Sequence, residues 1–229
     1  RGPNFMVVCA CSSSTTAIGT AFRSIRDGYA DIALCGGADA MFEPGTFAGW
    51  NNLGVMSQSN DPLQACRPFD KDRDGTILGE GAAALVLESL EHAKKRGTAI
   101  KGIIAGYGES SDADHITKPN PYGQSHAIIS AIKDANITPT DIAFINAHGT
   151  ATKSNDVCES KSINLALENH AKNTPVASYK AFFGHLLGAS GAIETIVSLL
   201  GIEHDLMPGN YNLQNPDPEC DLKFAPNTP

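Results

Sequence analysis

One local pattern occurs twice in this chain and constrains its fold more than any other feature. An apolar run at residues 5–9 precedes Cys11, and apolar residues at helical spacing follow it as far as Gly28. Residues 175–178 precede His185 in the same way, and a second helix rich in small residues follows. This repetition of strand, turn and helix predicts an α/β fold with two related halves and mainly parallel strands.

The hydrophobic pattern of the remaining residues predicts further strands and helices in both halves. Strands are predicted at residues 31–35, 82–87, 100–107, 142–145 and 220–224, and helices at 127–135, at 156–167 and after His185. Residues 41–66 are rich in Pro, Gly and Asn and are predicted to be irregular. A polar stretch at 92–97 is a plausible seam, so the halves are expected at residues 1–97 and 98–229.

Length and composition exclude several classes of function. The 229 residues suffice for a large core, and a net charge of −8 argues against non-specific nucleic-acid binding. No apolar stretch approaches the ~20 residues that span a bilayer, and no signal peptide is evident, so we expect a cytoplasmic protein without membrane insertion. The six cysteines include no C-x-x-C pair, which favours reduced thiols and predicts neither a metal site nor a cofactor.

Cys11 is the leading candidate for a nucleophile. It lies where a strand gives way to a helix, and unpaired N–H groups and the dipole at a helix N-terminus favour thiolate. Taken alone, a buried cysteine is more often a small apolar residue. The segments at 146–150 and 180–185 carry His148, Lys180 and His185, which are the expected partners of the sulfur.

Two acidic motifs are better explained by a structural role than by catalysis or metal binding. Asp70, Asp72, Asp74 and Gly75 match the opening of a calcium loop, but position twelve is Gly81 instead of Glu, so a turn with internal Arg–Asp pairing is the better interpretation. Residues 156 and 159 are an Asp and a Glu whose spacing resembles a capping box that opens a helix.

Together, five motifs resemble the β-ketoacyl-acyl carrier protein synthases, the elongating condensing enzymes of the thiolase superfamily. The resemblance runs over essentially the whole chain and implies a layered α/β fold with two related halves. It also implies a fragment without the first third and the closing glycine-rich loop, which we expect to be inactive or nearly so. Cys9 stands where the family commonly has Thr. The motifs are residues 10–13, 35–38, 67–75, 146–150 and 184–189.

The resemblance implies a role for each candidate residue. Cys11 would accept an acyl group from a carrier thioester, and His148 and His185 would donate N–H bonds to the enolate formed when malonyl thioester loses carbon dioxide. Lys180 would support His185, and Glu194 would either reach the site or pair with Lys180. The implied partners are acyl carrier protein bearing acyl or malonyl groups, and a second copy in a homodimer. The other histidines are expected to be surface or packing residues: His92, His115, His126, His170 and His204.

Two other classes of function remain open. Chain-length factors, the non-catalytic partners of ketosynthases, typically lack the nucleophile, so Cys11 with both histidines argues against that class. A Cys-His hydrolase would have to admit water, whereas carbanion chemistry at a thiol site must exclude it. The sequence therefore favours decarboxylative condensation in fatty acid or polyketide-type elongation.

Overall fold

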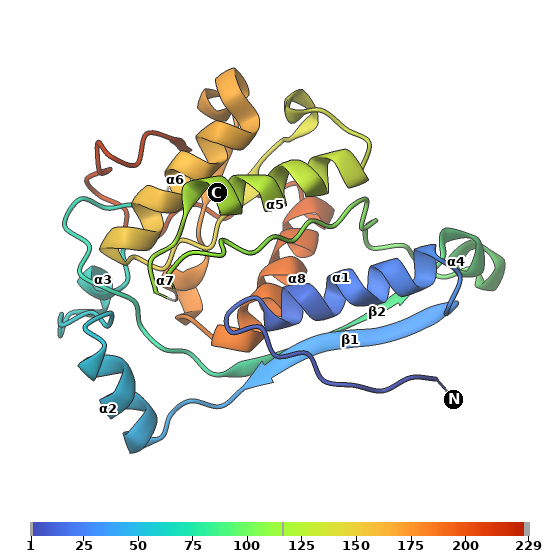
Figure 1. Ribbon diagram of the computed structural model, residues 1–229, viewed down its shortest axis with the longest axis horizontal. Helices are drawn as coiled ribbons and strands as arrows, with labels where there is room; N and C mark the ends of the chain where they lie inside the picture. Colours follow the sequence, from blue (N-terminus) through green and yellow to red (C-terminus); the bar gives the residue numbers. More distant parts are fainter. Residues whose placement is uncertain (1, 116, 227–229) are drawn as a thin grey trace. The chain divides into compact units, whose positions relative to one another are not determined.

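The computed structural model describes residues 2–115 and 117–226 (Figure 1). The chain divides into two compact units. Unit 1 contains the described parts of Arg1–Met41, Gly79–Ile104 and Leu186–Leu206. Unit 2 contains the described parts of Phe42–Leu78, Ala105–His185 and Met207–Pro229. Because the units interleave along the chain, they are a different division from the predicted halves 1–97 and 98–229, which stay a prediction.

Unit 1 is built on a two-stranded sheet. Strands β1 (Ile32–Asp39) and β2 (Gly81–Glu88) confirm the strands predicted at 31–35 and 82–87. They pair antiparallel, so the expected parallel pairing is wrong here. The reason is the path of the chain. It leaves β1 at Asp39 and begins β2 at Gly81, and Gly81 pairs with Asp39, so the two strands run in opposite directions.

Helices cover one face of this sheet. Ile18 of α1 (Ser13–Arg26) and Ala192 of α8 (Ser190–Glu203) form a buried apolar core with Leu85 of β2. Figure 1 shows both helices beside the sheet. The unit also contains α4 (Leu90–Arg96) and the short 3₁₀ helix η3 (Leu187–Ala189).

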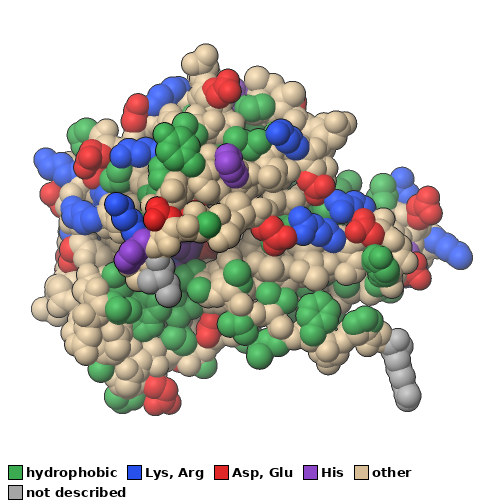
Figure 2. Space-filling model, viewed as in Figure 1, with side chains coloured by type: hydrophobic (Ala, Val, Ile, Leu, Met, Phe, Trp, Pro, Cys, Tyr) green, Lys and Arg blue, Asp and Glu red, His purple; other side chains and the backbone are tan. Residues whose placement is uncertain are grey.

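Two predicted strands are absent from the described chain. Residues 5–9 form no strand, and Phe5, Met6 and Val8 are 64%, 85% and 78% exposed. Figure 2 shows hydrophobic side chains, in green, along the lower side of the face in view. The apolar run predicted burial, but among the described residues it has no strand to pair with.

Residues 100–107 form no strand either. They pack against helices, and none of the strand pairs in the described chain includes them. A Cβ on Gly102 would lie 2.4 Å from the Leu199 side chain, and one on Gly106 would lie 2.4 Å from the backbone nitrogen of Ala135. The backbone N–H of Tyr107 donates to the Asp134 carboxylate, 2.9 Å away, instead of to another strand.

Unit 2 contains the parallel strands that the sequence predicts. Strands β3 (Ile145–Asn146), β4 (Pro175–Ala177) and β5 (Lys223–Phe224) pair in that order, each within a predicted strand or overlapping one. Helices α5 (Pro121–Asp134) and α6 (Lys153–Leu167) correspond to the helices predicted at 127–135 and 156–167. The buried core includes Phe69, Ile163 and Val176.

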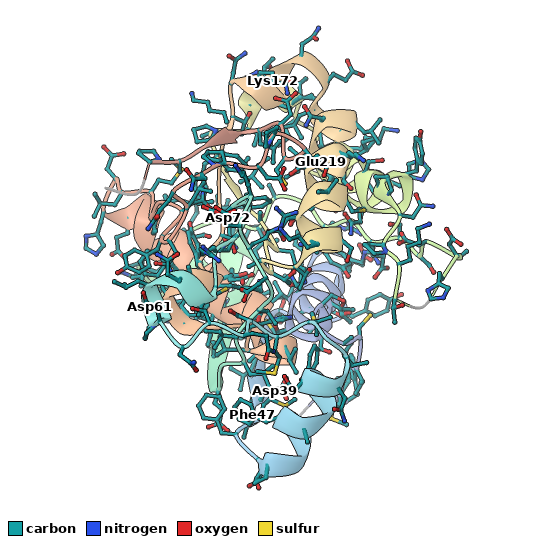
Figure 3. All side chains as sticks on the ribbon, turned by 90° about the vertical axis from the view of Figure 1, so that its left-hand side faces the viewer. Asp39, Phe47, Asp61, Asp72, Lys172 and Glu219 are labelled. Carbon is teal, nitrogen blue, oxygen red and sulfur yellow. The ribbon has the colours of Figure 1, made fainter. Side chains whose placement is uncertain are left out.

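Unit 2 also contains three shorter elements: α7 (Lys180–Phe183), η1 (Pro139–Asp141) and η2 (Glu168–Lys172). Lys172, which Figure 3 labels at the end of η2, pairs with Asp221.

The segment at 41–66 is less irregular than expected. It contains α2 (Pro44–Asn52) and α3 (Pro62–Ala65), each of which begins with a proline at its first helical position. Asp61 caps α3 by accepting a hydrogen bond from the Leu63 N–H at 3.0 Å (Figure 3). Pro44 and Pro62 therefore begin helices, whereas the composition was interpreted as breaking them.

The Asp-rich motif is a structural clamp and not a calcium loop. Both oxygens of Asp70 accept backbone N–H bonds, one of them from Gln214 and Asn215 at 2.9 and 2.8 Å. Arg73, which is fully buried, contacts Asp217 at 2.5 Å and Asp156 at 3.4 Å. The expected Arg–Asp pairing exists, but its carboxylates come from distant segments instead of from within the motif.

None of the described helices combines the length and apolar character that crossing a bilayer requires.

We predict that Arg73→Leu lowers the free energy of unfolding by about 3–5 kcal/mol, because Asp156 loses its buried cation. Urea unfolding monitored by circular dichroism measures the change. Arg26→Leu is the matched control, since the Arg26–Asp27 pair is about half exposed and such pairs contribute about 0–1 kcal/mol. Equal losses in the two variants would contradict the assignment of Arg73 as a clamp.

Candidate active site

Cys11 lies in a tight turn directly before α1. The Ser12 N–H donates to the Cys9 carbonyl at 3.0 Å, and the Ser13 N–H donates to the Ala10 carbonyl at 3.1 Å. Ala10 has a φ of 46°, which costs a non-glycine residue about 1–3 kcal/mol. The half-buried Cys11 is thus held two residues before the first residue of α1, which confirms its predicted place at a helix N-terminus.

The start of α8 is capped by side chains from other elements of unit 1. The Ala192 N–H donates to Oγ of the buried Ser14 at 3.0 Å, and the Gly188 N–H donates to the Asp39 carboxylate at 2.6 Å. A Cβ on Gly37 would lie 2.7 Å from the Gly188 carbonyl, so only glycine allows this approach. No local sequence pattern reveals the roles of Ser14 and Asp39, because their hydrogen bonds join residues more than a hundred positions apart.

His148 and His185 lie together in unit 2. Their ring centroids are 5.2 Å apart, and the rings meet edge to face at 82°. His148 follows β3, and its turn continues through Gly149 at a φ of 39°. His185 follows α7 and Gly184, and its N–H donates to the Ile77 carbonyl at 2.7 Å. The structure therefore brings together the two imidazoles that the sequence singled out.

The carboxylate of Glu159 fixes the His148 turn. It accepts the backbone N–H bonds of His148 at 2.6 Å and Gly149 at 2.8 Å, and the Ser178 hydroxyl donates to the Gly149 carbonyl at 2.8 Å. The capping interpretation of residues 156 and 159 is wrong, since α6 begins at Lys153 and both side chains point to other segments. Asp156 accepts the N–H of Phe69 at 2.7 Å.

Burial keeps both imidazoles uncharged at neutral pH. The pKa of His185 is lowered to about 3 by burial together with the positive charge of Lys180, which acts in the same direction. Burial, Lys180 and His185 hold the pKa of His148 well below its ordinary value. Each neutral ring has one N–H to donate and one lone pair. The lone pairs could bind a metal ion, but the charge of Lys180, which is fully buried nearby, opposes a cation there.

The five predicted residues divide between the units. Lys180, the first residue of α7, belongs to unit 2 with the two histidines. Cys11 belongs to unit 1 with Glu194, which is buried in α8. α8 begins at Ser190, so His185 lies before the regular helix. Within one helix, the nine-residue spacing would turn His185 and Glu194 to different sides, so both can serve one site only if His185 lies outside the helix.

Solved structures of ketosynthases resemble this fold closely. A type II polyketide synthase ketosynthase, solved with its acyl-carrier protein and bound to the hexaketide, is 38% identical with a TM-score of 0.92, over 96% of this chain and 55% of that one. The ishigamide ketosynthase/chain length factor is 42% identical with a TM-score of 0.89, over 95% of this chain and 52% of that one. The fold is therefore that of the ketosynthases, which confirms the predicted thiolase-like α/β class.

The sequence comparisons identify the family. Residues 1–93 match the β-ketoacyl synthase N-terminal domain, and residues 101–214 match the β-ketoacyl synthase C-terminal domain. A 3-oxoacyl-[acyl-carrier-protein] synthase 2 from Synechocystis is 48% identical over 99% of this chain and 55% of its own length. The chain belongs to the β-ketoacyl synthase family, and it spans about half the length of the curated relatives it matches.

We predict that the stability of the chain depends on His185 below neutral pH. The pKa of this residue is about 3 in the folded state and about 6.5 when unfolded, so its contribution is complete above about pH 6.5. As the pH falls below that value, only the unfolded state binds the proton, and stability declines by about 1.4 kcal/mol per pH unit.

Urea unfolding at about pH 6.5 and about pH 4.5 tests this. His185→Asn should lessen the decline, whatever its own effect on stability, while the exposed His204→Asn should leave it unchanged. A His185→Asn variant with the same decline as the wild type would show that His185 titrates normally in the folded chain.

Proposed function

We propose that this chain carries the chemistry of an elongating 3-oxoacyl-acyl carrier protein synthase. The proposed reaction is the decarboxylative Claisen condensation of an acyl-enzyme thioester with a malonyl group on acyl carrier protein. The observation that carries the proposal is the pair of uncharged imidazoles with centroids 5.2 Å apart, next to a buried lysine. Membership of the β-ketoacyl synthase family supports it.

The first proposed step is acyl transfer to Cys11. Its thiolate attacks the carrier thioester, the tetrahedral intermediate collapses, and the carrier thiolate leaves and takes up a proton. One thioester replaces another, so the exchange has little free-energy cost. The helix N-terminus next to Cys11 favours the thiolate, and the backbone N–H of Cys11 is the proposed oxyanion donor.

The second proposed step forms the carbon nucleophile. Malonyl thioester loses carbon dioxide, and the electron pair of the broken bond moves into an enolate whose oxygen accepts N–H bonds from His148 and His185. Losing one such donor typically costs about 3 kcal/mol. Neutral rings suit this role because an imidazolium could protonate the carbanion. Their lowered pKa values therefore support the proposal.

The third proposed step joins the two acyl groups. The carbanion attacks the carbonyl of the Cys11 thioester, and the new carbon–carbon bond displaces the Cys11 thiolate. This step requires Cys11 to face both imidazoles, which is part of the proposal. Lys180 is proposed to position His185 and keep it neutral, and Glu194 is proposed to support the same region from α8.

The remaining parts of the proposal concern the whole protein. We propose acyl carrier protein as its partner, a homodimer as its assembly and the cytoplasm as its location. The solved ketosynthase complex with an acyl-carrier protein supports the partner, and six cysteines without a disulfide in the described chain suit a reducing compartment. Residues 1–97 are proposed to be the C-terminal part of its first thiolase-like half, which carries the nucleophile, and residues 98–229 most of the second, which carries both histidines.

The alternative is a partner subunit of the chain-length-factor type. A non-catalytic subunit needs neither a thiol at a helix N-terminus nor two neutral imidazoles. The chain has all three, so we favour the enzyme.

We predict that full-length protein incubated with an acyl carrier thioester gains one acyl group, and that Cys11→Ala abolishes the gain. Intact mass followed by peptide mapping measures it. Cys35→Ala is the matched control, because Cys35 is a half-buried cysteine of the same unit. A wild-type protein that stays unacylated would favour the partner subunit.

We further predict that His185→Ala slows carbon dioxide release from malonyl carrier protein by about a hundredfold or more. Release of labelled carbon dioxide measures the rate, and the exposed His126→Ala is the control. Acyl-enzyme hydrolysis without carbon dioxide release would instead support a Cys-His hydrolase.

A further inference from the structure

The proposed reaction leaves one thiol near the nucleophile unexplained. Neither Cys9 nor Cys11 is in a disulfide, and the two lie two residues apart in unit 1. Cys9 is exposed and Cys11 is half-buried. No step of the condensation uses Cys9.

The turn before α1 folds residue 9 back beside residue 11. The Cys9 carbonyl accepts the Ser12 N–H at 3.0 Å, the Cys9 N–H donates to Oγ of Ser13 at 2.8 Å, and Cys9 and Cys11 form a β-bridge. The ends of this four-residue turn are residues 9 and 12, which its hydrogen bond holds within about 7 Å, and residue 11 inside the turn therefore lies closer to residue 9 than in an extended chain. A disulfide needs Cα atoms within about 6.8 Å. The positive φ of Ala10 is the feature that closes this turn.

We propose that Cys9 and Cys11 are a reversible oxidation site, in which Cys9 resolves the oxidised form of Cys11. Hydrogen peroxide is the oxidant. The Cys11 thiolate attacks one peroxide oxygen, the O–O bond breaks, and Cys11 sulfenic acid and hydroxide form. The Cys9 thiol then attacks the Cys11 sulfur, the S–O bond breaks, and the disulfide forms with loss of water. Two equivalents of an external thiol restore both cysteines.

The other cysteines are poor substitutes for Cys9. Cys66, Cys158 and Cys220 are buried, and burial raises the pKa of Cys66 to about 12 and that of Cys220 to about 11. Cys35 is half-buried, its thiol lies 3.8 Å from the Leu85 carbonyl, and burial raises its pKa also. These four therefore stay protonated at neutral pH, and they serve as internal controls for selectivity.

The disulfide would have a clear consequence for the protein. A sulfenic acid left alone is oxidised further to sulfinic acid, which external thiols do not reverse. Closing the Cys9–Cys11 bond stops that sequence at a reducible state. Because the ring encloses only one residue, the bond is strained and easily reduced, which suits a reversible modification.

The test treats the protein with hydrogen peroxide, blocks free thiols with N-ethylmaleimide and maps peptides by mass spectrometry. We expect the wild-type peptide with Cys9 and Cys11 to lose the mass of two hydrogen atoms and to recover it with dithiothreitol. In Cys9→Ser the same peptide should instead gain two oxygen atoms on Cys11 and not recover. Cys35→Ser should behave like the wild type.

Two results would overturn the proposal: wild-type Cys11 that gains oxygen as readily as in Cys9→Ser, or a disulfide that uses another cysteine. Neither readout requires condensation. A protein whose Cys11 accepts an acyl group but forms no disulfide would refute only this inference, and a disulfide without acyl transfer would refute only the proposed function.

Discussion

The proposed chemistry depends on holding two imidazole rings uncharged inside unit 2. Burial supplies most of this effect, and the ammonium group of Lys180 adds to it because a second positive charge nearby is unfavourable. The rings are also fixed through their backbone. Glu159 accepts two N–H bonds at the His148 turn, and the Ile77 carbonyl accepts the N–H of His185. The same burial that disfavours their charge therefore prepares them as N–H donors.

Positive φ angles gather next to the predicted site residues. Five residues with positive φ lie within three positions of Cys11, His148 or His185, and three of them are not glycine. At the three residues that are not glycine, such an angle persists only where the surrounding structure over-determines it, and strained angles of this kind cluster at functional sites. In this chain these angles turn the backbone sharply where a strand or helix ends or begins. The five residues are Ala10, Gly149, Ala151, Gly184 and Leu187.

The sequence predicts the local features of the site better than it predicts the distant residues that hold the site in place. The strand–turn–helix pattern and the family motifs pointed to Cys11, His148 and His185, and the structure confirms the helix after Cys11 and the pairing of the imidazoles. Predictions from the local sequence pattern were wrong where a segment's packing or hydrogen-bonding partners lie far away in the sequence. Residues 5–9 carry a strand pattern without a strand beside them, and residues 100–107 pack on helices. Glu159 matched a capping box, yet its carboxylate binds a turn eleven positions earlier.

The motif at residues 67–75 shows how a clamp can serve a site that it does not line. Arg73 pairs with Asp156, whose carboxylate also accepts the N–H of Phe69 and so holds that residue at a φ of 64°. In this position the Phe69 ring borders Gly149, where an added Cβ would lie 3.1 Å from it. The ring and Ser178 thus enclose the turn that follows His148. An arginine far from the imidazoles in sequence therefore constrains one of them through a buried carboxylate and an aromatic ring, which gives the acidic motif a structural role in this fold.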